Sequence, residues 1–214
     1  MSDVKRVSKR TQKARETRAR ILKAAGELFV RDGYGTTNLQ DIAELAGVAV
    51  QTIYFVFGNK RTLLKELVDV TVAGDDEPVA TLDRPWFQAA MATGDAEAHL
   101  RAHVRGTRPV LERVAPITKV LDTAVAMDPE VAALWSLGTD PRHVVQSTTA
   151  ASLMAKPGAR PDVPVEVAAD VLFALLSPEL FLLLVADRGW SPERYEEWVY
   201  RTLAVQLLAE PGDQ

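Results

Sequence analysis

The sequence predicts an all-α protein built from an N-terminal three-helix domain that contains a helix-turn-helix and a larger helical C-terminal domain. Three observations lead to this prediction. Apolar residues recur at helical spacing along most of the chain, glycine separates short helical segments near the N-terminus, and basic residues are concentrated in the same region. We expect a basic arm at 1–15, the helix-turn-helix domain at 16–65, and the second helical domain at 66–214.

The first two helices are defined by apolar periodicity and by residues suited to helix ends. A stripe from Ile21 to Phe29 follows the 3.6-residue helical period, and Gly33 is a plausible left-handed cap after it. Residues 36–38 (Thr-Thr-Asn) offer side chains that can cap a second, short helix. This second helix is expected to end at Gly47 and to bury one face. The residues of that face are Leu39, Ile42, Ala43 and Ala46.

The third helix, at about 50–56, is expected to be the recognition helix. A helix-turn-helix needs a small inner residue where its two helices cross and a turn residue that tolerates positive φ, and Ala43 and Gly47 meet these needs. The recognition helix must present short or polar side chains to a groove about 12 Å wide. A fourth helix is expected to start near Lys60. The side chains that the third helix can offer outward are Val50, Gln51, Thr52, Phe55 and Val56.

The C-terminal domain also has helical composition throughout. Helical segments are expected near 84–92, 95–106, 108–126 and 128–154, with prolines between or within them, and two long helices at about 164–187 and 192–209 close the chain. Pro178 should kink or break the first of these two. Ser191 and Pro192 are suited to begin the second, as N-cap and first helical residue.

Charge is distributed unevenly between the two domains. Residues 1–65 carry 13 Lys and Arg against 6 Asp and Glu, whereas the remainder carries 12 basic and 23 acidic residues. Because residues 1–65 are basic and the remainder is acidic, a polyanionic partner is favoured at the N-terminal region. Charge asymmetry is common, however, so this observation gains weight only beside the helix-turn-helix pattern.

Composition excludes several classes of site and location. The chain has 214 residues and no cysteine, which rules out disulfides, thiolate zinc sites and a cysteine nucleophile. A basic N-terminus without an apolar core argues against secretion, so a cytoplasmic protein is expected. The longest apolar region, around 171–186, is interrupted by Ser-Pro-Glu at 177–179, so no membrane span is expected. No cofactor is expected either.

A resemblance to a known family rests on an ordered run of residues. The run from Gly33 to Val48, GYGTTNLQDIAELAGV, is followed by Thr-Ile-Tyr at 52–54, Phe57 and NKRTL at 59–63. Together they resemble the signature of the TetR family of regulators over about residues 12–68. Further on, LSPEL at 176–180 and RGWSPERY at 188–195 resemble the C-terminal region of many actinobacterial members.

The resemblance implies an all-helical homodimer that binds a palindromic double-stranded DNA operator and is released from it by a small-molecule inducer. It makes 16–65 the helix-turn-helix DNA-binding domain and 66–214 the helical effector-binding and dimerisation domain. It implies base contacts from Gln40 and from the start of the recognition helix, Val50 to Thr52. Positions matching Thr37, Tyr54 and Lys60 are implied to contact phosphates or lie near them. Within the basic arm and the first helix, Arg18 is expected to contact DNA backbone. The expected DNA-binding residues are Arg18, Thr37, Gln40, Val50, Gln51, Thr52, Tyr54, Phe55 and Lys60.

Three positions depart from the family pattern. Ala49 replaces the usual serine at the turn, so an N-cap hydrogen bond worth about 1 kcal/mol is lost. Gln51 stands where a small residue is usual and could contact adenine through two hydrogen bonds. Val56 replaces a frequent histidine or tyrosine and removes a polar contact. These departures prevent prediction of the operator by analogy.

The C-terminal domain offers candidates for other kinds of site. His99 and His103 have the i, i+4 spacing of metal ligands, but no further ligand is evident, so no metal site is predicted and an exposed polar face is favoured. Large apolar side chains could instead line an inducer pocket or form ordinary core. The pocket candidates are Trp86, Phe87, His103, Trp135 and Phe173.

The two closing helices carry apolar residues on more than one face, which favours a homodimer through a four-helix bundle over burial within one subunit. The candidate interface residues are Val171, Leu175, Phe181, Leu184, Trp198 and Leu203.

Three functions follow in order of support. The leading hypothesis is a repressor that responds to a ligand. The second is a DNA-binding repressor or architectural protein without an effector. A helical enzyme has least support, because the sequence contains no glycine-rich phosphate loop and no nucleophile elbow.

Overall fold

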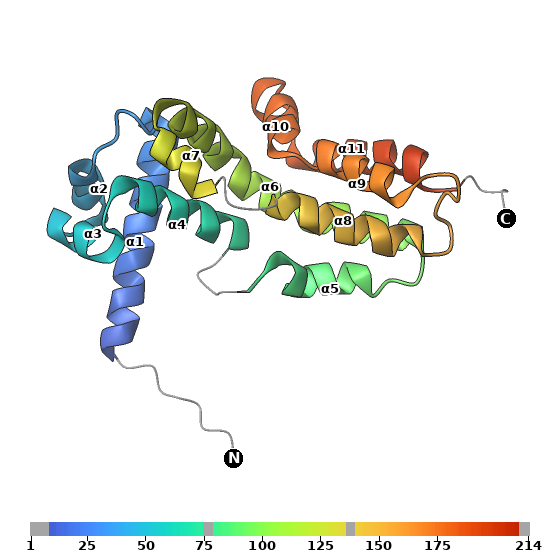
Figure 1. Cartoon of the computed structure of the whole chain (residues 1–214), viewed down its shortest axis with the longest axis horizontal. Coiled ribbons are helices and arrows are strands. Elements are labelled where there is room, and N and C mark those ends of the chain that lie inside the picture. Colours follow the sequence, from blue (N-terminus) through green and yellow to red (C-terminus); the bar gives the residue numbers. More distant parts are fainter. Residues whose placement is uncertain (1–8, 75–78, 136–139, 210–214) are drawn as a thin grey trace, which may run out of the picture. The chain divides into compact units, whose positions relative to one another are not determined.

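The computed structural model describes residues 9–74, 79–135 and 140–209, and within them all regular secondary structure is helical apart from one isolated bridge between Ala159 and Leu208 (Figure 1). The expected all-α fold is confirmed. The helices form two compact units. Unit 1 comprises Met1–Val70 and Lys119–Ser136, and unit 2 comprises Thr71–Thr118 and Leu137–Gln214.

Unit 1 begins with four helices that match the predicted order. They are α1 (Lys9–Asp32), α2 (Leu39–Ala46), α3 (Val50–Phe57) and α4 (Lys60–Ala73), of which α4 runs on into unit 2. α1 packs against α2, and α2 against α3 (Figure 1). The apolar stripes predicted from the sequence form the core of these helices. The side chains in this core include Ile21, Leu22, Ala25, Leu28, Phe29, Ile42, Ala43, Ile53, Phe57, Leu63 and Leu64.

Residues suited to helix ends occupy those ends. Gly33 has φ of 89° after α1, and the Asn38 side chain accepts a hydrogen bond from the Asp41 backbone N–H at the start of α2. Both match the sequence-based prediction. Asn59 caps α4 in the same way, accepting from the Thr62 N–H at 2.9 Å. Each cap pairs a backbone group that the helix leaves without an internal partner.

Unit 1 is completed by the end of α6 (Ala96–Met127) and by α7 (Pro129–Trp135). The Arg61 guanidinium on α4 donates to the Asp128 carboxylate at 2.7 Å and also pairs with Glu130. This ion pair lowers the pKa of Asp128 through the hydrogen bond from Arg61. Val131 is fully buried, so α7 contributes to an apolar core as well as to the surface.

Unit 2 contains η1 (Thr81–Asp83), α5 (Pro85–Met91), most of α6, α8 (Pro141–Met154), α9 (Val165–Leu175), α10 (Pro178–Phe181), a π-helical turn (Leu182–Asp187) and α11 (Pro192–Leu207). In this unit α9 packs against α8 and α11. Ser191 caps α11 and Pro192 is its first residue, as predicted. The core of the unit includes Leu100, Val104, Leu111, Leu153, Leu172, Phe181, Tyr195, Val199 and Leu203.

α6 differs from the prediction because it is one 32-residue helix rather than two segments. It passes through Pro109 and Pro116, each of which removes one backbone hydrogen bond from the helix. Buried side chains on both sides of these prolines, including Val104, Leu111 and Ala115, hold the helix in place. Burial of a continuous apolar face therefore outweighs the local cost of the two prolines.

The predicted break at Pro178 is confirmed. α9 ends at Leu175, and Ser177 caps the new helix by accepting from the Leu180 N–H at 3.1 Å. The Tyr195 hydroxyl donates to the Leu175 carbonyl oxygen at 2.7 Å, which satisfies an acceptor left open by the break. Burial of this hydroxyl raises the pKa of Tyr195.

The stretch Val165–Asp187 is long and apolar enough to cross a membrane by length and composition, contrary to our expectation that no segment would be. The expectation counted the interruption at 177–179 but not the high mean hydropathy on both sides of it. A buried core helix meets the same criterion, and part of this stretch forms the core of unit 2. The composition by itself therefore does not indicate a membrane span.

Candidate nucleic-acid interface

The turn between α2 and α3 has the geometry that a helix-turn-helix requires. Gly47 adopts a left-handed conformation with φ of 64° and ψ of 44°. Its N–H donates to the Glu44 carbonyl at 3.1 Å, and the Val48 N–H donates to the Ala43 carbonyl at 3.0 Å. Ala43 itself is buried, so its small side chain lies in the packed interior as predicted. Glycine is favoured at position 47 because a Cβ is strained at this positive φ.

α3 buries one face and exposes the other. Ile53 and Phe57, one helical turn apart, are its buried residues, whereas Gln51 and Phe55 are exposed. The Ala49 N-cap makes no side-chain hydrogen bond, so the capping loss inferred from the sequence is present. The expected recognition helix therefore presents to solvent the side chains that were predicted to contact bases.

Of the other residues predicted to contact DNA, some have exposed side chains and one is buried. Gln40 on α2 and Tyr54 on α3 are exposed, and Val50 and Thr52 are partly exposed. Thr37, in contrast, is buried, and its hydroxyl donates to the Gly33 carbonyl at 2.8 Å. Thr37 therefore stabilises the turn between α1 and α2 in this structure.

Lys60 holds the same turn from α4. Its ammonium group donates to the carbonyl oxygens of Tyr34 at 2.7 Å and Thr37 at 2.9 Å, and it lies 4.2 Å from the centre of the Tyr34 ring. Burial lowers the pKa of Lys60, and the charge of Asp128 opposes that shift. The sequence located Lys60 beside the reading helices but could not show these backbone contacts, which join residues far apart in the chain.

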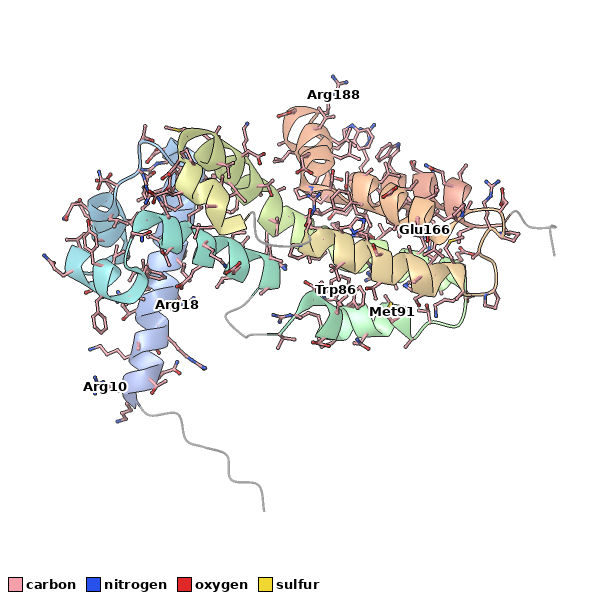
Figure 2. All side chains as sticks on the ribbon, in the orientation of Figure 1. Arg10, Arg18, Trp86, Met91, Glu166 and Arg188 are labelled. Carbon is pink, nitrogen blue, oxygen red and sulfur yellow. The ribbon has the colours of Figure 1, made fainter. Side chains whose placement is uncertain are left out.

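Arg18 also has a partner within unit 1. Its guanidinium lies 2.6 Å from the Glu66 carboxylate on α4 and 5.9 Å from the centre of the Phe57 ring. The neighbouring basic side chains Arg10, Lys13 and Arg20 are exposed on α1 (Figure 2 marks Arg10 and Arg18). The described part of the predicted basic arm is therefore helical, and residues 1–8 lie outside the described residues.

Comparison with known proteins identifies the family. Residues 21–67 match the family of bacterial regulatory proteins, tetR family. Over 91 residues, which are 41% of this chain and 68% of the relative, the sequence is 33% identical to TtgW, an uncharacterised HTH-type transcriptional regulator of Pseudomonas putida. The chain belongs to the TetR family. Because that family comprises transcriptional regulators and is non-enzymatic, the alternative of a helical enzyme is excluded.

The family match of this TetR-family protein, residues 21–67, lies within unit 1. The HTH-type transcriptional regulator TtgR, also from Pseudomonas putida, is 46% identical over 63 residues, which cover only 29% of this chain and 30% of TtgR. The fold is shared much further. A transcriptional regulator from Saccharomonospora viridis, solved in complex with choline, superimposes with a TM-score of 0.69 and covers 91% of this chain and 99% of that one, at 21% identity.

A buried polar cluster lies in unit 2 of the TetR-family chain. His103 on α6 hydrogen-bonds through Nε2 to the Gln146 side-chain oxygen at 3.0 Å, and its Nδ1 lies 3.5 Å from the Thr149 hydroxyl. Its ring lies 6.1 Å from that of Trp86 and 6.0 Å from that of Phe87, both on α5 (Trp86 is labelled in Figure 2). Three of the five predicted pocket residues, Trp86, Phe87 and His103, are therefore brought together.

A fourth predicted pocket residue, Phe173, has different neighbours. The Phe173 ring instead lies 5.8 Å from the His143 ring, and the Arg142 guanidinium lies 4.5 Å from its centre. The Trp135 side chain lies outside the described residues.

His99, one turn before His103, is fully buried, and neither of its ring nitrogens has a hydrogen-bond partner. The expectation that this pair forms an exposed polar face is therefore wrong, because α6 turns it into the core of unit 2. Burial lowers the pKa of both imidazoles to about 4, and the charge of Lys156 adds to the shift for His99. Among the described residues, no group of three possible metal ligands lies close enough to hold an ion.

The predicted interface residues of unit 2 differ in how far their side chains are buried. Val171, Leu175, Leu184 and Trp198 are partly exposed, whereas Phe181 and Leu203 belong to the core and support the surface from beneath. A groove of about 320 Å³ lies over α9 and α11. Its lining residues are Arg160, Val163, Val167, Val171, Val205, Gln206 and Leu207.

Proposed function

We propose that this protein is a sequence-specific DNA-binding transcriptional regulator that acts inside the cell. The observation that carries the proposal is the left-handed Gly47 turn, which joins α2 to a helix with Gln51 and Phe55 exposed opposite its buried face. Membership of the TetR family supports it. In a helix-turn-helix, the outward side of the second helix enters the major groove and contacts base edges.

The proposed contacts fall into two groups. Base contacts come from exposed or partly exposed side chains of α2 and α3, whereas phosphate contacts come from α1, from Tyr54 on α3 and from the start of α4. Replacing Gln51→Ala should therefore relax preference at one operator position, whereas loss of a phosphate contact should weaken all sequences alike. The base-contacting group is Gln40, Val50, Gln51, Thr52 and Phe55, and the phosphate-contacting group is Arg18, Tyr54 and Lys60. Thr37 was expected near a phosphate, but its side chain is buried, so its proposed role is to hold the turn beside that group.

Arg18 needs a paired test, because it already has an ion-pair partner in Glu66. If Arg18 contacts phosphate, Arg18→Ala should weaken binding to every DNA and reduce its salt dependence by about one unit of slope. Glu66→Gln should then leave binding intact or strengthen it, because the guanidinium is freed. Equal losses in both variants would show that Arg18 acts only by supporting α4.

We further propose that the regulator is a homodimer. Val167 and Val205, with 48% and 76% of their surface exposed, lie along the groove on α9 and α11 and would be covered by the same surface of a second subunit. The two helix-turn-helix domains of the dimer would then bind half-sites about one DNA turn apart. Two half-sites together give a sequence specificity that one short recognition helix cannot supply. The operator should accordingly be palindromic.

The family resemblance supports repression that is relieved by a small-molecule inducer. A repressor would be released from its operator when a small molecule binds the C-terminal domain more tightly in the form that does not bind DNA. The cluster of Trp86, Phe87 and His103 is our proposed inducer site. The resemblance of 176–195 to the C-terminal region of actinobacterial members remains part of this proposal.

Selection of bound duplexes from a random DNA pool at physiological salt tests the central claim. Enrichment of a palindrome by the purified protein is the expected result. Binding that is salt-sensitive but has no sequence preference would refute sequence-specific regulation.

The selected operator then allows a screen for compounds that release labelled DNA. A Trp86→Leu variant that responds to an active compound as the parent protein does would argue against the proposed inducer site.

A further inference from the structure

The proposed recognition helix has no charged side chain. α3 reads VQTIYFVF, and only glutamine, threonine and tyrosine among its residues carry polar side-chain atoms. Arginine and lysine, which commonly contact guanine, are missing from it. Base recognition by α3 must therefore rely on a few neutral hydrogen-bonding groups and on apolar contact.

Phe55 is the most exposed large apolar side chain among the described residues, at 90% of its surface. It follows Gln51 by four residues, so the two side chains lie on the same face of α3, about 6 Å apart along the helix axis. Ile53 and Phe57 are buried, and the helical period places Phe55 almost directly opposite them. The phenyl ring is thus presented on the side of α3 that faces away from the core of unit 1.

The major groove offers one apolar group to such a ring. Each base pair presents hydrogen-bonding atoms there, and thymine alone adds a methyl group, which phenylalanine can contact. Charge favours DNA as the occupant, because residues 1–65 carry 13 basic and 6 acidic residues. The neighbouring Gln51 side chain is suited to adenine, so the two residues fit adjacent A·T pairs.

We propose that Phe55 reads a thymine 5-methyl group in each operator half-site, within two base pairs of the position that Gln51 contacts. The distance between the two residues along α3 is close to two base-pair steps of B-DNA, at about 3.4 Å each. This inference rests on the proposed function. It adds a chemical identity, a methyl group, to one position of an operator that the sequence alone does not give.

Replacing thymine with deoxyuridine tests the proposal, because it removes the methyl group and keeps every base-edge hydrogen bond. The selected operator is resynthesised with deoxyuridine at each thymine in turn, and binding is measured by fluorescence anisotropy. For the parent protein, we expect one thymine position of the half-site to be sensitive. Deoxyuridine there should weaken binding about fourfold when one half-site is changed and about fifteenfold when both are changed. Phe55→Ala should bind more weakly and show no further loss at that position.

Val56→Ala is the matched control, because Val56 is a neighbouring apolar residue on α3 with 37% of its surface exposed. This variant should keep the deoxyuridine sensitivity of the parent protein. Phe55→Ala should also keep the parent's thermal stability, since an exposed side chain contributes little packing. Its sedimentation coefficient should be unchanged, and a shift in it would show that Phe55 is instead covered by another copy of the chain.

The outcomes separate this proposal from the function on which it rests. Sensitivity to deoxyuridine that Phe55→Ala removes and Val56→Ala retains would support methyl recognition. A selected operator that tolerates deoxyuridine at every position, or the same sensitivity in both variants, would overturn methyl recognition by Phe55 and leave sequence-specific binding intact. Failure to select any operator would overturn both.

Discussion

Acidification of the His99→Leu variant tests whether the buried imidazole of His99 is held uncharged. The pKa of His99 is lowered from 6.5 to about 4, chiefly by burial, and the pKa of His103 is lowered to a similar value. Between pH 6.5 and about pH 4, each of these imidazoles binds a proton in the unfolded chain but not in the folded chain. The free energy of unfolding therefore falls as the pH decreases from about 6.5 towards 4.

The expected loss can be worked from these pKa values. Between pH 7 and pH 5, one imidazole with a folded pKa of about 4 and an unfolded pKa of about 6.5 lowers the free energy of unfolding by about 2 kcal/mol. His99 and His103 together should lower it by about twice as much. His99→Leu removes one of the two titrating groups, so the variant should lose only about half as much stability as the parent protein.

The same substitution has an expected effect at pH 7. Both ring nitrogens of His99 are buried without a partner, and such groups cost about 1–3 kcal/mol each. Leucine is similar in size to histidine and has no polar atoms. We therefore expect His99→Leu to be as stable as the parent at pH 7, or more stable, unless repacking around the new side chain offsets the gain.

Urea unfolding followed by far-ultraviolet circular dichroism at pH 7 and pH 5 measures both effects, at one protein concentration so that any dimerisation is constant. His143→Gln is the control, because His143 is the only other histidine of the chain and is exposed. That variant should follow the parent at both pH values. Equal losses in the parent and in His99→Leu would refute our account of the buried imidazole.

Three further predictions concern unit 1 and the proposed dimer. Gly47→Ala should destabilise the protein by about 1 kcal/mol and weaken operator binding, because φ at this position is 64°; an unchanged melting temperature would contradict the strain argument. Val205→Glu should shift a dimer towards monomer in analytical ultracentrifugation without unfolding it, and a persistent dimer would locate the interface elsewhere. Arg61→Ala, which breaks the pairs with Asp128 and Glu130, should lower the melting temperature by no more than about 4 °C, because the pairs are partly exposed; a larger fall in differential scanning calorimetry would indicate a deeper role.

The helix-turn-helix could be predicted closely because its signals are local. Gly33, Asn38 and Gly47 each fix a helix end through a backbone conformation or a hydrogen bond to a residue a few positions away. Apolar periodicity then identifies which face of each short helix is buried. The outward direction of Gln51 and Phe55 follows from the same period.

Features that depend on distant partners could not be predicted. The continuity of α6 through Pro109 depends on packing against other helices, which no local rule includes. The burial of His99 likewise depends on which side of α6 faces the core. The contact of Lys60 with the Tyr34 carbonyl joins residues 26 positions apart, and the family pattern located the lysine without indicating its partner.

Unit 1 is interrupted in the sequence, since Lys119–Ser136 completes a unit that begins with Met1–Val70. During translation, the helices proposed to bind DNA are made early, but Asp128, the partner of Arg61, emerges only after Thr71–Thr118 of the other unit. We expect a nascent chain that stops within that intervening stretch to be sensitive to proteases. A premature stop codon there should therefore yield rapidly degraded fragments rather than a free DNA-binding domain that competes with the intact regulator.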